Sequence, residues 1–136
     1  MLTTPPQANK KNTMSDYPLP NISTDLTGQV AFVTGTTSGL GRRFAKVLAA
    51  CGAKVAITGR RVERLNALAE EIRASGGICE PIAIDMTSRA SIREALARAQ
   101  ETLGTVQILV NNAGIPDAER AVKMSDELTD AVFDTN

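Results

Sequence analysis

Glycines and small hydroxyl residues form the segment of this chain whose spacing is best suited to chemistry. The segment reads Thr34-Gly35-Thr36-Thr37-Ser38-Gly39-Leu40-Gly41. It follows the apolar run 30–33, and it opens into a stretch with helical periodicity whose expected apolar face is Phe44, Val47, Leu48 and Cys51. A strand, a glycine-rich turn and a helix in this order present free backbone N–H groups at the positive end of a helix dipole. The segment therefore predicts a site for an anion.

The three glycines of this turn have separable roles. We expect Gly35 to allow the sharp turn out of the strand, and Gly39 to let a pyrophosphate approach the backbone closely. We expect Gly41 to let the helix pack tightly on the sheet. Thr37 and Ser38 are predicted hydroxyl donors, either to the ribose phosphate or to the loop itself. The alternative is an ordinary tight connection from strand to helix, because a glycine-rich turn alone is weak evidence.

Two arginines follow the second predicted strand, at the position that selects the adenosine ribose in dinucleotide-binding folds. An acidic residue normally stands there, about 20 residues past the glycines, and its carboxylate binds the 2′-hydroxyl of NAD. Here the position is Gly59, followed by Arg60 and Arg61. Guanidinium groups suit a 2′-phosphate and no carboxylate repels it, so the sequence favours NADP over NAD. The alternative is that both arginines simply solvate the start of a helix.

A second block of small polar residues, Asn111-Asn112-Ala113-Gly114, directly follows the apolar strand predicted at 106–110. Asparagine side chains can bond exposed backbone groups at a strand end. Ala113 and Gly114 leave room for a ribose to pass. Arg42, just after the glycine turn, is a further candidate for phosphate contact, unless it faces solvent.

The spacing T-G-x-x-x-G-x-G and the later N-N-A-G together resemble the short-chain dehydrogenase/reductase family, over roughly residues 26–136. The resemblance implies that Asp85 contacts the adenine amino group and that Met86 contributes backbone hydrogen bonding. The alternative for Asp85 is that it begins the helix cap at Thr87 or Ser88. The predicted cofactor-binding residues are Gly35, Thr37, Ser38, Gly39, Leu40, Gly41, Arg60, Arg61, Asp85, Met86, Asn112, Ala113 and Gly114.

The proton-transferring residues of the resembled family are a serine and a Tyr-x-x-x-Lys pair, in which the lysine lowers the pKa of the tyrosine. The single tyrosine of this sequence is Tyr17, and Asn21 stands where the lysine is required. The resemblance assigns Asn136 to a proton relay. We therefore expect the cofactor-binding N-terminal half of a reductase, inactive by itself, with its substrate pocket formed by segments after Asn136.

The fold expected from the pattern is α/β, with nearly continuous apolar strands alternating with helices. Such strands are buried on both faces, so we expect a doubly wound parallel sheet of the Rossmann type, in strand order 3-2-1-4. Residues 1–25 are expected to be a flexible arm and residues 26–136 an incomplete nucleotide-binding domain. The expected strands are 29–33, 54–58, 80–84 and 106–110, and the expected helices end near 50, span 62–74, follow Thr87 or Ser88, and start near Ser125. The fourth strand should have an exposed apolar edge.

The composition excludes several classes of function. The 136 residues carry 15 basic and 15 acidic side chains, which gives no support to nucleic-acid or anionic-membrane binding. The absence of histidine removes Ser-His-Asp chemistry and histidine-ligated metals. Cys51 and Cys79 lack metal-ligand spacing and are typical of a reducing cytosol, so we expect a cytoplasmic protein without a metal. No apolar run reaches the roughly 20 residues that span a bilayer.

Two functions follow from these observations. The first is an NADP-dependent oxidoreductase that interconverts a small-molecule alcohol and a carbonyl, whose full-length parent is expected to be a homo-oligomer by resemblance. The second is a module that binds or senses NADP(H) without chemistry. An epimerase-type relative fits less well, because its glycine spacing resembles T-G-x-x-G-x-x-G. A Tyr-x-x-x-Lys block in downstream sequence would distinguish the enzyme from the module.

Overall fold

The computed structural model describes residues 23–115 and 125–135, which contain a four-stranded parallel sheet. Its strands are β1 (Val30–Val33), β2 (Lys54–Gly59), β3 (Ile78–Ala83) and β4 (Val106–Val110). They lie in the order β3-β2-β1-β4, and all three pairings are parallel. The predicted α/β fold and strand order are therefore confirmed. The predicted β4 bounds agree with the structure, whereas β3 begins two residues earlier than expected and ends one residue earlier.

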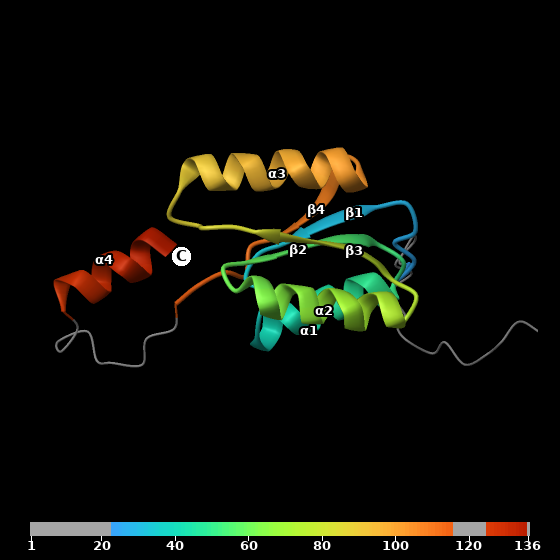
Figure 1. Ribbon diagram of the computed structural model, residues 1–136, viewed down its shortest axis with the longest axis horizontal. Coiled ribbons are helices and arrows are strands. Elements are labelled where there is room, and N and C mark those ends of the chain that lie inside the picture. The colour runs from blue at the N-terminus through green and yellow to red at the C-terminus, as the bar shows by residue number, and fades with distance from the viewer. Residues whose placement is uncertain (1–22, 116–124, 136) are drawn as a thin grey trace, which may run out of the picture.

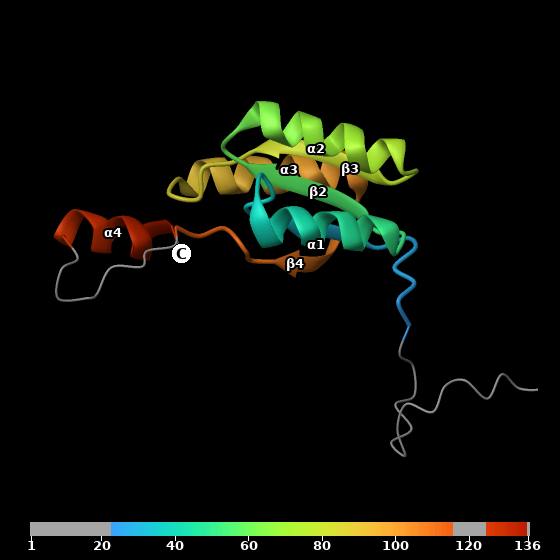
Figure 2. The same cartoon turned by 90° about the horizontal axis from the view of Figure 1, so that it is seen from below.

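Helices cover both faces of the sheet (Figure 1). The helices of the described residues are α1 (Gly39–Ala50), α2 (Val62–Ala74), α3 (Arg89–Leu103) and α4 (Asp126–Thr135), of which the first three cover the sheet. Helices α1 and α2 lie side by side on one face, and α3 lies on the other (Figures 1 and 2). The Ser88 hydroxyl caps α3 by accepting from the Ser91 N–H at 3.2 Å, and the Ser125 hydroxyl accepts from Leu128 at the start of α4. The helix starts predicted at these serines are confirmed.

Alternate residues of each strand point to opposite faces, and this alternation builds two cores. In β1, Ala31 and Val33 pack with residues of α1 and α2, such as Ala45 and Leu68. Val30 and Phe32 instead pack in the second cluster, which contains Ala95, Ala99 and Leu103 of α3. The central strand is thus apolar throughout because both of its faces are buried.

Helix α1 contacts the sheet through a different face from the one predicted. Its buried residues are Gly41, Ala45 and Ala49, four residues apart, whereas Phe44 is 39% exposed and Val47 is 45% exposed. Of the predicted face, Leu48 is partly buried against the core and Cys51 forms the C-cap. The reason is steric: a stripe of small residues lets the helix backbone approach the sheet closely, which larger side chains prevent.

Strands β3 and β4 form the two edges of the sheet within the described residues. Alternate residues of β4 are exposed, and Leu109 is 61% exposed, so the predicted exposed apolar edge is confirmed. Pro81 lies inside β3, opposite Ile57. Proline is tolerated there because an edge strand has one side without ladder hydrogen bonds.

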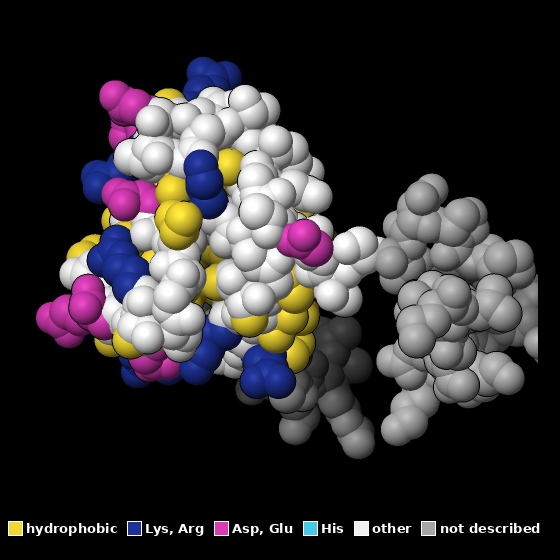
Figure 3. All heavy atoms as spheres, turned by 90° about the vertical axis from the view of Figure 1, so that its right-hand side faces the viewer, with side chains coloured by type: hydrophobic (Ala, Val, Ile, Leu, Met, Phe, Trp, Pro, Cys, Tyr) yellow, Lys and Arg dark blue, Asp and Glu magenta, His cyan; other side chains and the backbone are white. Residues whose placement is uncertain are grey.

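Charged side chains of both signs are interspersed on the face of the molecule that Figure 3 shows, in keeping with the zero net charge. None of the helices in residues 23–115 and 125–135 is long and apolar enough to cross a membrane. Most of the predicted arm, residues 1–22, and the predicted relay residue Asn136 lie outside the described residues.

Candidate functional site

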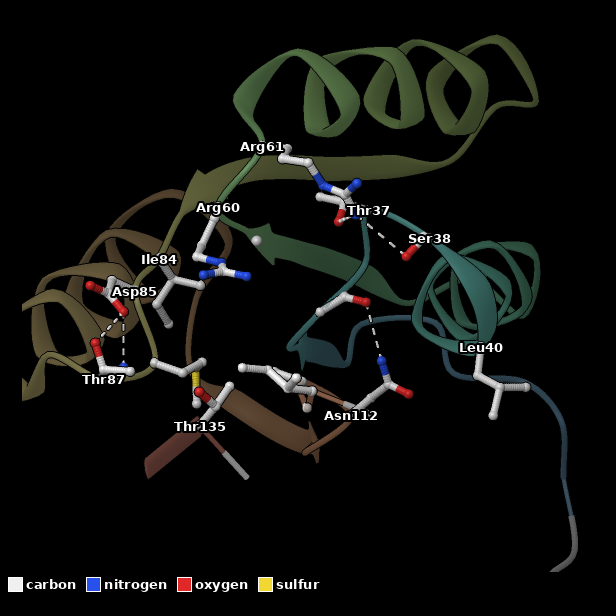
Figure 4. A pocket seen from close by; sticks show the side chains of 16 residues that line it. Thr37, Ser38, Leu40, Arg60, Arg61, Ile84, Asp85, Thr87, Asn112 and Thr135 are labelled. Atoms are coloured by element: carbon white, nitrogen blue, oxygen red, sulfur yellow. Dashed lines mark hydrogen bonds between the residues drawn. The ribbon is translucent and has the colours of Figure 1, made fainter. Parts of the chain in front are cut away.

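A cleft of about 980 Å³ lies at the carboxyl ends of the strands (Figure 4). Each strand supplies part of its lining through the residues that follow it. The lining residues are Gly35, Thr37, Ser38, Leu40, Gly59, Arg60, Arg61, Ile84, Asp85, Met86, Thr87, Asn112, Ala113, Gly114, Ile115 and Thr135. Ligands of open α/β sheets bind in this position, where the strand order reverses between β1 and β4.

All the predicted cofactor-binding residues except Gly39 and Gly41 line this cleft. The structure therefore brings the glycine turn, the arginine pair, Asp85-Met86 and the 112–114 segment together, although they are far apart in sequence. Gly39 and Gly41 lie in the first turn of α1. The structure gives a different reason for a glycine at each of these two positions.

Gly41 is buried at the contact between α1 and the end of β4. A Cβ atom there would lie 2.8 Å from the carbonyl carbon of Gly35 and would also overlap with the carbonyl oxygen of Gly35 and with Nδ2 of Asn112. The predicted packing role of Gly41 therefore agrees with the structure. Gly39 has a φ of +56°, and no atom of the described residues outside its own neighbourhood lies within 4 Å of the place where a Cβ would stand, so space for a ligand is open on that side.

Gly35 makes the turn out of β1 with a φ of +70°, a conformation that L side chains rarely adopt. A Cβ at this position would also lie 2.8 Å from the Cα of Ala113. The glycine is thus required twice, by the turn and by the close approach of the segment that follows β4.

Hydrogen bonds tie the glycine turn to the segment after β4. The Thr34 hydroxyl accepts from the backbone N–H groups of Asn112 at 3.0 Å and Ala113 at 2.9 Å. The Asn112 side chain in turn donates from Nδ2 to the carbonyl oxygens of Thr34 at 3.2 Å and Gly35 at 3.1 Å. The sequence-based expectation that an asparagine bonds backbone groups at the strand end is confirmed for Asn112.

Replacing Thr34 with valine is expected to lower the free energy of unfolding by about 2 kcal/mol. Thr34 is 3% exposed, and the substitution keeps its shape while leaving two backbone N–H groups without their acceptor. Urea denaturation followed by circular dichroism measures the change. Thr102→Val, at an exposed hydroxyl that bonds within its own helix, is the matched control and should change stability by less than about 0.5 kcal/mol. Equal effects of the two substitutions would contradict the role of Thr34.

The start of α1 has the features of an anion site. Its N-cap, Ser38, makes no side-chain capping hydrogen bond among the described residues, and the first turn holds no acidic residue. The first backbone N–H groups of this 12-residue helix are therefore available to an anion at the positive end of its dipole. Arg42 does not contribute to this site, because it pairs with Glu71 of α2, which also accepts from Lys46 at 3.2 Å.

The two arginines after β2 occupy different parts of the cleft (Figure 4). Arg61 donates from Nη2 to the Thr37 hydroxyl at 2.8 Å, and a longer contact of 3.5 Å joins it to the Ser38 hydroxyl. Arg60 extends into the cleft and forms no hydrogen bond within the described part of the chain. Together they place two exposed cations beside the glycine turn.

Asp85 lies across the cleft from the glycine turn. Its Oδ1 accepts from the Thr87 hydroxyl at 2.7 Å and from the Thr87 N–H at 2.9 Å. These hydrogen bonds, with a smaller contribution from the charge of Arg60, hold the pKa of the Asp85 carboxyl below its ordinary value of 3.8. The carboxylate is therefore ionised at neutral pH and acts as an acceptor. The alternative that Asp85 begins the helix cap agrees with the structure. Its carbonyl oxygen accepts from the N–H of Ser88, the N-cap of α3, at 3.1 Å, and its own N–H donates to the Ser91 hydroxyl at 2.9 Å.

Thr87→Val is expected to raise the pKa of Asp85 toward 3.8, because it removes the hydroxyl that lowers this pKa most. The sign follows from linkage: a lowered pKa stabilises the folded state above pH 3.8, and this contribution is lost as the pH falls through the lowered value. Titration of the Asp85 carboxyl by NMR measures the shift. Arg60→Ala should give a smaller rise, and the reverse order would contradict this assignment.

Sequence reasoning did not assign several residues that build the site. Besides Gly59, which the sequence placed at the ribose-selecting position, the cleft is also lined by Ile84, Thr87, Ile115 and Thr135. Ile84, Thr87 and Ile115 lie within five residues of the carboxyl ends of β3 and β4, which is a signal that the sequence offers. Thr34 directly follows β1 and begins the glycine-rich motif, but the sequence does not show that its hydroxyl acts on a segment 78 residues away.

Comparison with known proteins identifies relatives of the whole described sheet. Residues 29–136 match the family described as short chain dehydrogenase. A short chain dehydrogenase of Pseudocercospora fijiensis is 43% identical over 90 residues, which cover 66% of this chain and 29% of that protein.

Solved structures of dehydrogenases are also similar to this chain. A dehydrogenase/reductase from Sinorhizobium meliloti 1021 has a TM-score of 0.79 and 37% identity, and the match covers 83% of this chain and 45% of that one. A blue fluorescent protein from a metagenomic library, solved in complex with NADPH, has a TM-score of 0.73 and 34% identity, with 81% and 46% covered. The chain thus spans between 29% and 46% of the length of these proteins.

Proposed function

The chain belongs to the short-chain dehydrogenase/reductase family of oxidoreductases, and on that premise we propose that it is the cofactor-binding part of an NADP-preferring enzyme. The reaction of the whole protein is the interconversion of an alcohol and a carbonyl in a small molecule. The nicotinamide cofactor, when bound, supplies or accepts the hydride. The residues of this chain bind and orient it.

The cleft fits a dinucleotide by its donors and its shape. The uncapped N–H groups of α1 and the Ser38 hydroxyl suit the pyrophosphate, and the open space beside Gly39 permits close approach to the backbone. The volume of about 980 Å³ lies at the upper end of the range typical of small-molecule sites. Leu40 and Gly41 complete the turn that holds these donors.

The observation that carries the preference for NADP is the arginine pair beside a glycine at the end of β2. Gly59 provides no carboxylate for a 2′-hydroxyl, whereas Arg60 and Arg61 both line the cleft. Two guanidinium groups bind a 2′-phosphate through charge-assisted hydrogen bonds. The NADPH bound to the metagenomic relative supports the same preference.

The remaining cleft residues orient the other parts of the cofactor. Asp85 accepts a hydrogen bond from the adenine amino group, for which its ionised state is suited. Met86 contributes a backbone contact, and Ala113 and Gly114 allow the nicotinamide ribose to pass. Asn112 holds the glycine turn in place through its two hydrogen bonds.

Catalysis requires groups that these 136 residues do not contain. The sequence has no Tyr-x-x-x-Lys pattern, so we propose that this chain alone is inactive and that further segments supply proton transfer and the substrate pocket. Asn136 joins a proton relay in that complete enzyme, which is a homo-oligomer. The same missing pattern favours the second candidate, a module that binds or senses NADP(H) without chemistry.

Isothermal titration calorimetry of the chain with NADP⁺ and NAD⁺ tests the proposal. We expect NADP⁺ to bind at least about tenfold more tightly, which corresponds to about 1.4 kcal/mol. Binding of neither nucleotide would overturn the proposal, and tighter binding of NAD⁺ would overturn the assigned preference. Extension of the chain through any downstream Tyr-x-x-x-Lys block, followed by an NADPH oxidation assay, separates the enzyme from the binding module.

A further inference from the structure

We propose that Thr37 determines the choice between NADP and NAD, through its hydroxyl on one side and its methyl group on the other. The inference rests on the proposed function, since it concerns the same cleft. Thr37 is half-buried in the glycine turn and contacts both residue 59 and residue 61, at the end of β2 and the start of α2.

The hydroxyl of Thr37 fixes the guanidinium of Arg61. Arg61 is exposed, and an exposed arginine has many rotamers whose loss opposes the binding of an anion. The hydrogen bond of 2.8 Å from Nη2 to Thr37 Oγ1 restricts that freedom in advance. A guanidinium has five N–H donors, and this contact occupies one amino group, so the rest of the planar fork remains for a phosphate.

The methyl group of Thr37 occupies the space beside Gly59. A Cβ atom built on Gly59 would lie 2.7 Å from Thr37 Cγ2 and 3.6 Å from Leu65 Cδ2. Gly59 is the last residue of β2, where an acidic side chain would bind the 2′-hydroxyl of NAD. Thr37 therefore prevents the side chain that NAD requires, while it holds the side chain that a 2′-phosphate requires.

Selectivity thus depends on three residues together, which are Thr37, Gly59 and Arg61. Figure 4 shows Thr37 and Arg61 together at one rim of the cleft, with Arg60 extending from the neighbouring position. Arg60 lacks such a hydrogen bond among the described residues, so Thr37 affects the selectivity through Arg61. Thr37 is in this sense a positioning residue.

Two single substitutions separate the hydroxyl from the methyl group. Thr37→Val keeps the methyl group beside Gly59 and removes the hydroxyl, so we expect about fivefold to tenfold weaker binding of NADP⁺ and unchanged binding of NAD⁺. Thr37→Ser keeps the hydroxyl, and NADP⁺ binding should remain within about twofold of the parent chain. Calorimetry with both nucleotides measures each constant, and circular dichroism establishes that each variant is folded.

A double-mutant cycle tests whether Thr37 acts through Arg61. Once Arg61→Ala is present, Thr37→Val should cause no further loss of NADP⁺ binding. Additive losses would show that Thr37 contacts the nucleotide independently, and would overturn its positioning role.

A further pair of variants tests whether the Thr37 methyl group excludes a side chain at position 59. Gly59→Asp alone should weaken binding of both nucleotides, because the new side chain meets the Thr37 methyl group. Gly59→Asp combined with Thr37→Ser removes that methyl group and should bind NAD⁺ more tightly than NADP⁺. Equal NAD⁺ affinities of the single and double variants would show that the Thr37 methyl group does not exclude a side chain at position 59.

The outcomes distinguish this inference from the function on which it rests. If the parent chain binds neither nucleotide, both are wrong. If the parent chain prefers NADP⁺ and Thr37→Val retains that preference in full, the function stands and the role of Thr37 is wrong.

Discussion

Replacement of both Arg60 and Arg61 by alanine is expected to weaken NADP⁺ binding by about a hundredfold and to leave NAD⁺ binding within about twofold. Each guanidinium lines the cleft, and loss of a hydrogen bond to a charged group typically costs about 1.5–3 kcal/mol. Two such losses at the lower end of this range total about 3 kcal/mol, which corresponds to roughly a hundredfold change. Calorimetric titration with both nucleotides measures the effect.

Arg64→Ala provides the control for charge in this experiment. Arg64 lies in the first turn of α2, is exposed, and does not line the cleft. Its substitution changes the net charge without changing the site, so NADP⁺ binding should fall by less than about threefold through screened long-range attraction. A comparable loss in both variants would show that the arginines act as general surface charge and not as ligands of the 2′-phosphate.

Gly41→Ala is expected to lower the free energy of unfolding by about 3 kcal/mol. In an ordinary exposed helix position the same substitution stabilises by about 1 kcal/mol, because glycine is a poor helix former. Here the added methyl group overlaps with the backbone of Gly35 and with the Asn112 side chain, and neither can move without breaking the hydrogen bonds between them. Urea denaturation of the two chains measures the difference.

Leu40→Ala is the neighbouring control, since Leu40 is 67% exposed in the same helical turn. Its stability should stay within about 0.5 kcal/mol of the parent chain. A neutral or stabilising Gly41→Ala would mean that α1 can shift away from β4, and would contradict the tight packing described here.

The fold was predictable because its signals are local and repeated. The apolar run at 106–110 and the helix at 62–74 have the bounds that their patterns predicted, with glycines or serines marking most element ends. The strand order followed from the doubly wound arrangement expected for alternating strands and helices, and it places the glycine turn and the 111–114 block at the same edge of the sheet.

The packing of α1 was not predictable from periodicity. Hydropathy ranks Phe44 and Val47 above Ala45 and Ala49, yet the alanines are buried because their size allows the closest approach to the sheet. Periodicity reports which faces are apolar, and it does not report how far apart the layers lie. For the same reason, periodicity did not predict that Ala45 and Ala49 would be buried in line with Gly41.

The candidate site was predictable by residue type but not by contact. The glycines and arginines follow from the expected chemistry of a dinucleotide, and the role of Asp85 follows from the family resemblance. The hydrogen bonds of Thr34 and of Arg61 with Thr37 join segments far apart in sequence, and the motif that contains both threonines does not show which partners their hydroxyls bind. Arg42 shows the opposite case, because its partner Glu71 lies in another helix and removes it from the site.

The order of the strands also bears on how the protein folds. Contacts between β1 and β2 join residues about 25 apart, whereas Thr34 and Asn112 are 78 apart. Closing the longer loop costs roughly 1 kcal/mol more in chain entropy, so pairing β4 with β1 has the largest loop-closure cost among the strand pairings. During synthesis the glycine turn leaves the ribosome well before Asn112, whose side chain holds the turn through two hydrogen bonds. We therefore expect completion of the sheet and assembly of the cleft to occur together, late in folding.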